Sequence, residues 1–166
     1  MLLPVQWQAQ PTENFCWATV SSMVAIYYAS VFGIGQPLSP CQVATATLPE
    51  PTCCPQNPAV DPIPGACDVP FDIAFALSAI QHLNTTPPSL SGFDLVVQEI
   101  TNQRPLCAMI KYSAGPFHYV LVNGCDPASQ QVAIVDPAGR PTQLPVPFAN
   151  FVANSSFTLF QWVLTV

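Results

Sequence analysis

Apolar side chains recur with a helical period near the start of the chain. Between Cys16 and Val31 they return every three or four residues, which places them on one face of a helix. Gly33 and Gly35 follow this stretch and are expected to end it. The pattern therefore predicts a helix that begins near Cys16 and buries one stripe. The stripe comprises Trp17, Val20, Val24, Tyr27, Tyr28 and Val31.

Three further helices are predicted before position 105. One opens at Ser39, where serine serves as the N-cap and Pro40 takes the first helical position. Residues 69–83 and 94–103 fit two more helices, and Pro105 ends the second of them.

The pattern changes to that of strands in the last third of the chain. Four segments there are rich in β-branched and aromatic residues and are bounded by Gly/Pro turns. Helices followed by an antiparallel meander indicate an α+β fold. We expect one domain over residues 1–166, with a helical lobe to about residue 104 and a sheet lobe from about residue 105. The predicted strands are 106–112, 118–124, 131–136 and 157–165.

Charge and hydropathy exclude several functions. Only three residues are Lys or Arg, against nine acidic residues, so the chain carries a formal net charge of −6. Without a basic patch we expect no nucleic-acid binding, and no apolar run approaches the ~20 residues of a membrane span. Few charges and 20 prolines are typical of secreted proteins. The start, MLLPVQWQ, lacks the pattern of a signal peptide, so either the chain is intracellular or a leader precedes it.

Cys16 is the cysteine best placed for chemistry. The start of a helix favours the thiolate, because the helix dipole is positive there. Glu13 lies close in sequence and is expected to point outward. A catalytic thiol also needs a base and donors for an oxyanion.

His118 is the predicted base, and Asp136 the residue that orients it. His82 falls near the end of a predicted helix, where a solvated or C-capping histidine is ordinary. If residues 125–129 form a hairpin loop, His118 lies directly opposite Asp136, with the two Cβ atoms ~5 Å apart. A shift by one residue would turn Asp136 to the other face. The same register pairs Val122 with Val132 and Val120 with Ile134.

Asn123 and Asp126 are less suited to orient His118. Asn123 is five residues away on the same strand, hence on the opposite face and about 16 Å distant. Asp126 lies farther still, in the loop. Three glutamines precede Cys16, and a side-chain amide can serve an oxyanion hole. They are Gln6, Gln8 and Gln10.

These residues resemble the papain-like cysteine proteases. The order Cys…His…Asp, a glutamine six residues before the cysteine and a tryptophan directly after it all match that superfamily. The Cys-Gly-Ser/Ala-Cys signature of papain is absent. His118 follows Cys16 by 102 residues, closer than in papain, and Asp136 replaces asparagine. These differences point to the shorter bacterial branch, which includes avirulence-type cysteine protease effectors of plant pathogens.

The resemblance to that branch covers about residues 8–145. It consists of Q-x5-CWA, an adjacent cysteine pair, a turn similar to Gly-Arg-Pro before the first predicted strand, H-Y-V-L-V and a later Asp-Pro. The ABC-transporter-linked peptidases that cut double-glycine leaders share the triad, although this chain has no transporter segment. The matching segments are Gln10–Ala18, Cys53–Cys54, Gln103–Pro105, His118–Val122 and Asp136–Pro137.

The resemblance implies a papain-like fold of two lobes, with an active-site cleft between them. It implies a cysteine endopeptidase that cleaves peptide bonds through a thioacyl-enzyme, with Gln10 and the Cys16 N–H as the oxyanion hole. We expect a peptide or protein substrate, no metal or organic cofactor, and a monomer. Acyl transfer by the same triad, an inert peptide-binding module, and a domain in which Cys16 is only structural are the alternatives.

The six other cysteines are candidates for disulfides. An odd total leaves one thiol free in an oxidising compartment. The proline-rich stretch 49–66 cannot form regular structure, and two bridges could pin it. Adjacent cysteines rarely bond each other, so either 41–53 with 54–67 or 41–54 with 53–67 is expected. Cys107 and Cys125 could bridge neighbouring strands or remain as buried thiols. Zinc at the other four is an alternative that lacks C-x2-C spacing. These four are Cys41, Cys53, Cys54 and Cys67.

Overall fold

Helices occupy the first part of the chain and strands most of the rest, as the sequence predicts. The computed structural model describes residues 1–49, 52–56, 62–87, 92–139 and 145–166. The elements in chain order are α1 (Cys16–Phe32), α2 (Pro40–Thr47), α3 (Ile73–Ala79), β1 (Leu83–Thr85), α4 (Phe93–Thr101), β2 (Leu106–Tyr112), β3 (Phe117–Asp126), β4 (Gln131–Val135), β5 (Pro145–Pro147), α5 (Phe148–Val152) and β6 (Phe157–Thr165).

The six strands form one antiparallel sheet in the order β1-β6-β2-β3-β4-β5. The expected meander was therefore wrong for the last strand, which pairs with β2 instead of following β4. β6 is long, and its last residues are buried on both faces, so an interior position satisfies both its backbone and its side chains. The edges are held by the three-residue strands β1 and β5. β5 contains Pro145 and Pro147, which an edge strand tolerates.

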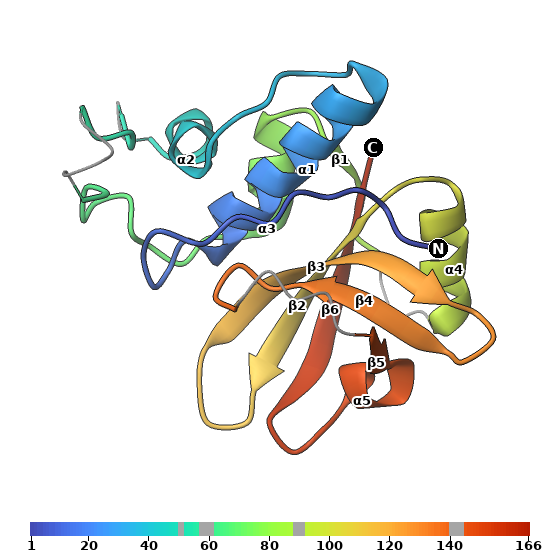
Figure 1. The fold of residues 1–166 in the computed structure, drawn as a ribbon. Coiled ribbons are helices and arrows are strands. Elements are labelled where there is room, and N and C mark those ends of the chain that lie inside the picture. Colours follow the sequence, from blue (N-terminus) through green and yellow to red (C-terminus); the bar gives the residue numbers. More distant parts are fainter. Residues whose placement is uncertain (50–51, 57–61, 88–91, 140–144) are drawn as a thin grey trace.

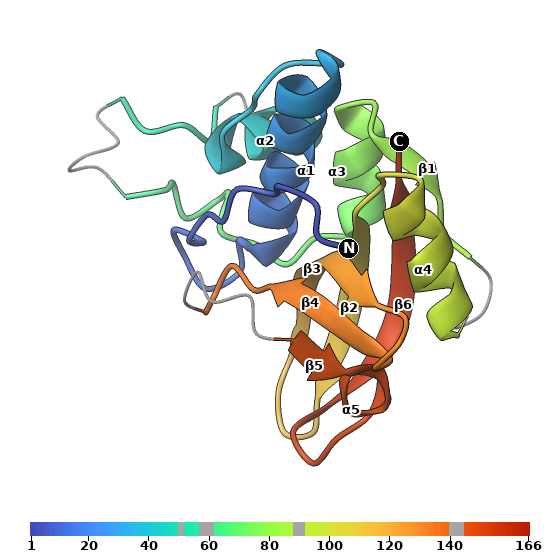
Figure 2. The same ribbon diagram turned by 45° about the vertical axis from the view of Figure 1, so that its right-hand side comes forward.

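Helix α1 is the centre of the helical group. Figures 1 and 2 show α1, α2 and α3 together beside one end of the sheet, with α4 apart from them along the sheet. Every residue from Cys16 to Ala25 is buried, so this part of α1 is covered all round and not only along the predicted stripe. The stripe was wrong for Val31, which is 39% exposed near the end of the helix. Gly33 ends α1, as the sequence predicted, and its backbone has the left-handed conformation, with a φ of 67°. None of the described helices is long and apolar enough to cross a membrane.

Helix α3 is shorter than the predicted segment 69–83. It begins after Asp72, whose side chain accepts a hydrogen bond from the Ala74 N–H and so caps the helix. The chain leaves the helix before Gln81, which has a φ of 62°. The residues that follow pair with β6 as β1. A sheet edge thus overrides helical periodicity at the end of this segment.

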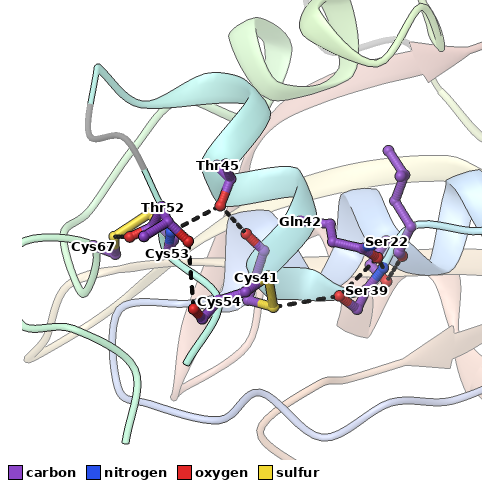
Figure 3. Close-up of a disulfide and its surroundings, with 10 residues drawn as sticks. Ser22, Ser39, Cys41, Gln42, Thr45, Thr52, Cys53, Cys54 and Cys67 are labelled. Atoms are coloured by element: carbon purple, nitrogen blue, oxygen red, sulfur yellow. Dashed lines mark hydrogen bonds between the residues drawn. A yellow bond between two sulfur atoms is a disulfide. The ribbon is translucent and has the colours of Figure 1, made fainter. Parts of the chain in front are cut away.

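Two disulfides pin the segment between α2 and α3. They join Cys41 to Cys54 and Cys53 to Cys67, which is the second of the two expected pairings and leaves no thiolate there for zinc. Figure 3 shows both bridges beside α2, where the Cys53 N–H donates to Thr45 Oγ1 at 2.8 Å. Part of the stretch 49–66 lies outside the described residues.

The suggested bridge between Cys107 and Cys125 was wrong. Both are buried free thiols, as is Cys16. Cys107 pairs with Leu121 in the β2–β3 ladder. Cys125 lies four residues farther along β3, or about 13 Å at the rise of a strand. A disulfide needs Cα atoms within about 7 Å of each other.

Replacing Cys41 and Cys54 together by serine should lower the free energy of unfolding by about 3 kcal/mol, the value for a loop of this length. The loss arises because the unfolded chain gains freedom. Urea unfolding without reductant measures it. With dithiothreitol, which reduces the bridge in the parent, the difference in the free energy of unfolding between variant and parent should become smaller. Equal unfolding free energies without reductant would contradict a stabilising role for this bridge.

Candidate active site

A cleft of about 640 Å³ lies between the start of α1 and the sheet. Its size is within the range of pockets that hold small ligands or substrate side chains. The helical side contributes Cys16, Trp17 and Phe71, and the sheet contributes Met109, His118 and Tyr119. Glu13 and Asp72 also line it, so the cleft carries acidic groups.

Cys16 is the first residue of α1 and is 8% exposed. The residue before it, Phe15, offers no side-chain cap to the helix. The first N–H groups of a helix have no partner within the helix, and the dipole makes this end positive. The thiol therefore lies where negative charge on its sulfur, or on a nearby oxygen, is stabilised. Glu13 is exposed to solvent, but it also lines this cleft, so the expectation that it points away from Cys16 is not met.

His118 lies near the start of β3 and is 6% exposed. Its Nε2 is 2.7 Å from Asp136 Oδ1. Burial acts to lower the pKa of His118, but hydrogen bonds with Asp136 and with Cys16 outweigh it and raise the pKa to about 9. With Nε2 on the carboxylate, Nδ1 is the ring nitrogen left for the thiol. The imidazole therefore stays protonated well above neutral pH.

Asp136 follows β4 directly and is held by several groups. Its Oδ1 also accepts the Ala138 N–H at 2.9 Å, and its backbone carbonyl accepts the indole N–H of Trp7 at 2.9 Å. Burial acts to raise the pKa of Asp136, but the hydrogen bonds from His118 and from backbone N–H groups prevail and lower it. The carboxylate is thus ionised and fixed in orientation.

The predicted register between His118 and Asp136 was wrong by two residues. Val122 pairs with Ile134, where Val132 was expected, so Asp136 lies diagonally from His118 and not directly opposite. The turn is tighter than residues 125–129, because β3 runs to Asp126. A shift by two residues keeps both side chains on one face, and diagonal neighbours remain within reach of long side chains.

Gln10 lines the same cleft, in the segment that precedes α1. Its Nε2 donates to the carbonyl oxygens of Thr12 and Glu13, both at 3.0 Å. Its own backbone N–H donates to the Pro137 carbonyl at 2.9 Å, next to Asp136. Gln6 is exposed, and Gln8 donates to Ser22 Oγ at 2.9 Å instead of reaching the cleft.

Two aromatic residues of the site were not found from the sequence. Trp7 fixes the carbonyl of Asp136, and the Tyr112 ring stacks on His118 with centroids 6.0 Å apart. Neither belongs to a motif, and both depend on pairing between distant segments. His82 lies elsewhere, buried against Tyr28 with its Nδ1 2.7 Å from the Val166 carbonyl. Among the described residues, no group of His, Cys, Asp and Glu could hold a metal ion.

Comparisons with known proteins identify a family and a fold for this chain. A family model described as the papain-like cysteine protease AvrRpt2 matches residues 1–156. A solved structure described as a C39-like peptidase, from Bacillus anthracis, covers 100% of this chain and 96% of its own, with 13% identity and a TM-score of 0.60. Xylellain, a cysteine protease from Xylella fastidiosa, covers 97% and 82%, with 13% identity and a TM-score of 0.48. No curated protein matches the chain by sequence.

Proposed function

This chain belongs to the papain-like cysteine proteases of the AvrRpt2 family, and on that premise we propose that it is an endopeptidase that uses Cys16, His118 and Asp136. The observation that carries the proposal is the hydrogen-bonded pair of His118 and Asp136 in the cleft that Cys16 lines. A protein or peptide substrate follows from membership of a protease family. Each of the three residues then has a distinct chemical role.

The first half of the reaction is acylation. The Cys16 thiolate attacks the scissile carbonyl carbon, and the carbonyl electron pair moves to oxygen. The Cys16 backbone N–H and Gln10 Nε2 stabilise this oxyanion. The C–N bond then breaks as protonated His118 gives its proton to the leaving amine, which leaves a thioester on Cys16.

The second half is hydrolysis of the thioester. Neutral His118 takes a proton from water, and the hydroxyl oxygen attacks the thioester carbon. The C–S bond breaks, the acid product leaves and the thiolate is restored beside the imidazolium. Asp136 keeps the imidazole oriented and favours its charged form throughout.

Selective alkylation tests the assignment of Cys16. With iodoacetamide at mildly acidic pH and no reductant, Cys16 alone should be modified, because thiolates react and thiols do not. Burial raises the pKa of the Cys107 and Cys125 thiols, so they should remain unmodified. His118→Ala should remove the reactivity of Cys16. No adduct on Cys16, or equal labelling of all three, would overturn the proposal and favour an inert module or a structural cysteine.

Gln10→Ala should lower kcat by about 10²- to 10³-fold, the cost of one oxyanion donor. To act, Nε2 must exchange one of its two loop carbonyls for the substrate oxygen. Gln8→Ala is the matched control, since Gln8 bonds Ser22 outside the cleft. Steady-state kinetics with a peptide substrate measure kcat and KM separately. A rise in KM with unchanged kcat would argue against an oxyanion role.

The two disulfides favour an oxidising compartment, and we propose that the enzyme acts outside the cell. We also propose that one peptidase domain, acting as a monomer, carries the whole site, because both sides of the cleft come from this chain.

A further inference from the structure

The ladder between β3 and β4 changes register at Asn123. On β4, two consecutive residues pair with residues that are two apart on β3, so Asn123 is the extra residue of a β-bulge. The pairs on the side of the site are Val122–Ile134 and Leu121–Val135, and those toward the hairpin turn are Gly124–Ala133 and Cys125–Val132.

This extra residue decides on which face of the sheet Asp136 lies. A regular ladder continued from the hairpin turn would pair Asp136 with Leu121. Directly opposed residues share a face, and neighbours along a strand alternate. Asp136 would then lie on the face away from His118. With the bulge, the continued ladder sets Asp136 opposite Val120, which shares a face with His118.

The bulge is held from outside the hairpin by the first residues of the chain. Asn123 is 0% exposed. Its Nδ2 donates to the Leu3 carbonyl at 3.0 Å, and its own carbonyl accepts the Leu3 N–H at 2.7 Å. A Cβ on the next residue, Gly124, would lie 2.7 Å from the Met1 carbonyl oxygen and 2.8 Å from Leu2 Cδ1. The bulge and this segment therefore fit closely together.

Packing alone does not account for an asparagine at this position. Its Oδ1 is buried without a hydrogen-bond partner among the described residues. A buried acceptor left unpaired costs stability, and an apolar side chain of similar size would avoid that cost. The contribution specific to asparagine is the Nδ2 bond to Leu3.

We propose that Asn123 is a positioning residue. Its bond to Leu3 holds the bulge, and the bulge keeps Asp136 on the same face of the sheet as His118. The inference rests on the proposed function, because it concerns the same pair of residues. The segment that clamps the bulge also reaches the far end of β4, where Trp7 donates to the Asp136 carbonyl. The N-terminal segment therefore contacts both partners of the hairpin, β3 at the bulge and the chain directly after β4 at Asp136.

Histidine-labelled NMR gives a direct test, because the chain has two histidines. His118 reports on Asp136, and the buried His82 reports on the fold. In Asn123→Val the His118 pKa should fall clearly below about 9, with the His82 signal unchanged. kcat should fall by about 10²-fold, a loss typical of misplaced catalytic groups, while KM changes little. Leu121→Val is the control, a buried change on the same strand that leaves the bulge.

Deletion of Asn123 should restore the high His118 pKa that Asn123→Val lowers. Without the extra residue, a regular ladder from Gly124 and Ala133 already pairs Val122 with Ile134. The face on which Asp136 lies then no longer depends on a bond to Leu3. One alanine inserted between Ala133 and Ile134 in the Asn123→Val background does the same by giving position 123 a partner. This insertion replaces the deletion if the deleted chain does not fold.

The outcomes separate this inference from the proposed function. A folded Asn123→Val protein with an unchanged His118 pKa overturns it. An equal fall of the His118 pKa in Leu121→Val also overturns the inference. So does a His118 pKa that stays as low as in Asn123→Val in both the deletion and the insertion variant. If Cys16 is not alkylated and no peptide is cleaved, but the His118 pKa still depends on Asn123 as described, the proposed function fails and the bulge keeps its role.

Discussion

Cys16→Ala should lower kcat/KM on a peptide substrate by about 10⁴-fold or more, the size of loss seen when an enzyme loses its nucleophile. The thiol lies at the first turn of α1, in a cleft shared with His118. No other free thiol can replace it, because Cys107 and Cys125 are buried away from the cleft lining. Cys16→Ser should be nearly as inactive, since a serine hydroxyl is not ionised by this environment.

The control for this prediction is Cys125→Ser, which changes another buried free thiol outside the cleft and should leave kcat/KM close to the parent value. Residues that act as one unit are strongly non-additive. Cys16→Ala combined with His118→Ala should therefore be no less active than Cys16→Ala alone. Losses that multiply in the double variant would show that the two side chains do not act on the same step.

Local sequence signals were sufficient for the parts of the site that depend on one element. Helical period and two glycines predicted α1, and so placed Cys16 at its start. Strand pattern located β2, β3, β4 and β6. His118 and Asp136 were expected on one face of the sheet, and the structure has them so. Alternation along a strand is a short-range property, and the sequence displays it directly.

Features that depend on pairing between distant segments could not be predicted. β1 and β5 have three residues each, too few for a period, and exist because a sheet edge accepts them. The position of β6 beside β2 is set by burial of both its faces. Trp7 reaches Asp136 across 129 positions of sequence. The error of two residues in the β3–β4 register has the same origin, because turn length and the bulge at Asn123 both enter it.

Asp136→Asn and Asp136→Ala should differ sharply, because the side-chain bonds of Asp136 with His118 and with the Ala138 N–H use the same oxygen. Oδ1 accepts from His118 and from the Ala138 N–H. An asparagine Oδ1 can keep both bonds, as the Cys-His-Asn enzymes of the papain type do, so activity at pH 6 should stay within about tenfold. Alanine removes both bonds and should cost about 10²- to 10⁴-fold, the usual contribution of a positioned acid–base group.

The pH profile distinguishes charge from orientation. In the parent enzyme the alkaline limb of kcat/KM should fall near pH 9, where His118 loses its proton. Asp136→Asn removes the negative charge, so the effect of burial gains weight and the His118 pKa, with the alkaline limb, should move to lower pH. An Asn variant that keeps the parent limb would show that Asp136 acts by orientation alone.

The stability of the folded chain provides the corresponding equilibrium measurement. The raised pKa of His118 means that its protonation stabilises the fold fully below about pH 6.5, and that this contribution is lost as pH rises through about 9. The free energy of unfolding of the parent, measured with urea, should therefore decline between about pH 6.5 and about pH 9. This decline should be smaller in Asp136→Asn. Because the bond between His118 and Asp136 is formed without substrate, the decline is expected in the free enzyme. A parent and a variant with parallel stability profiles from pH 6 to pH 10 would contradict the coupling between His118 and Asp136.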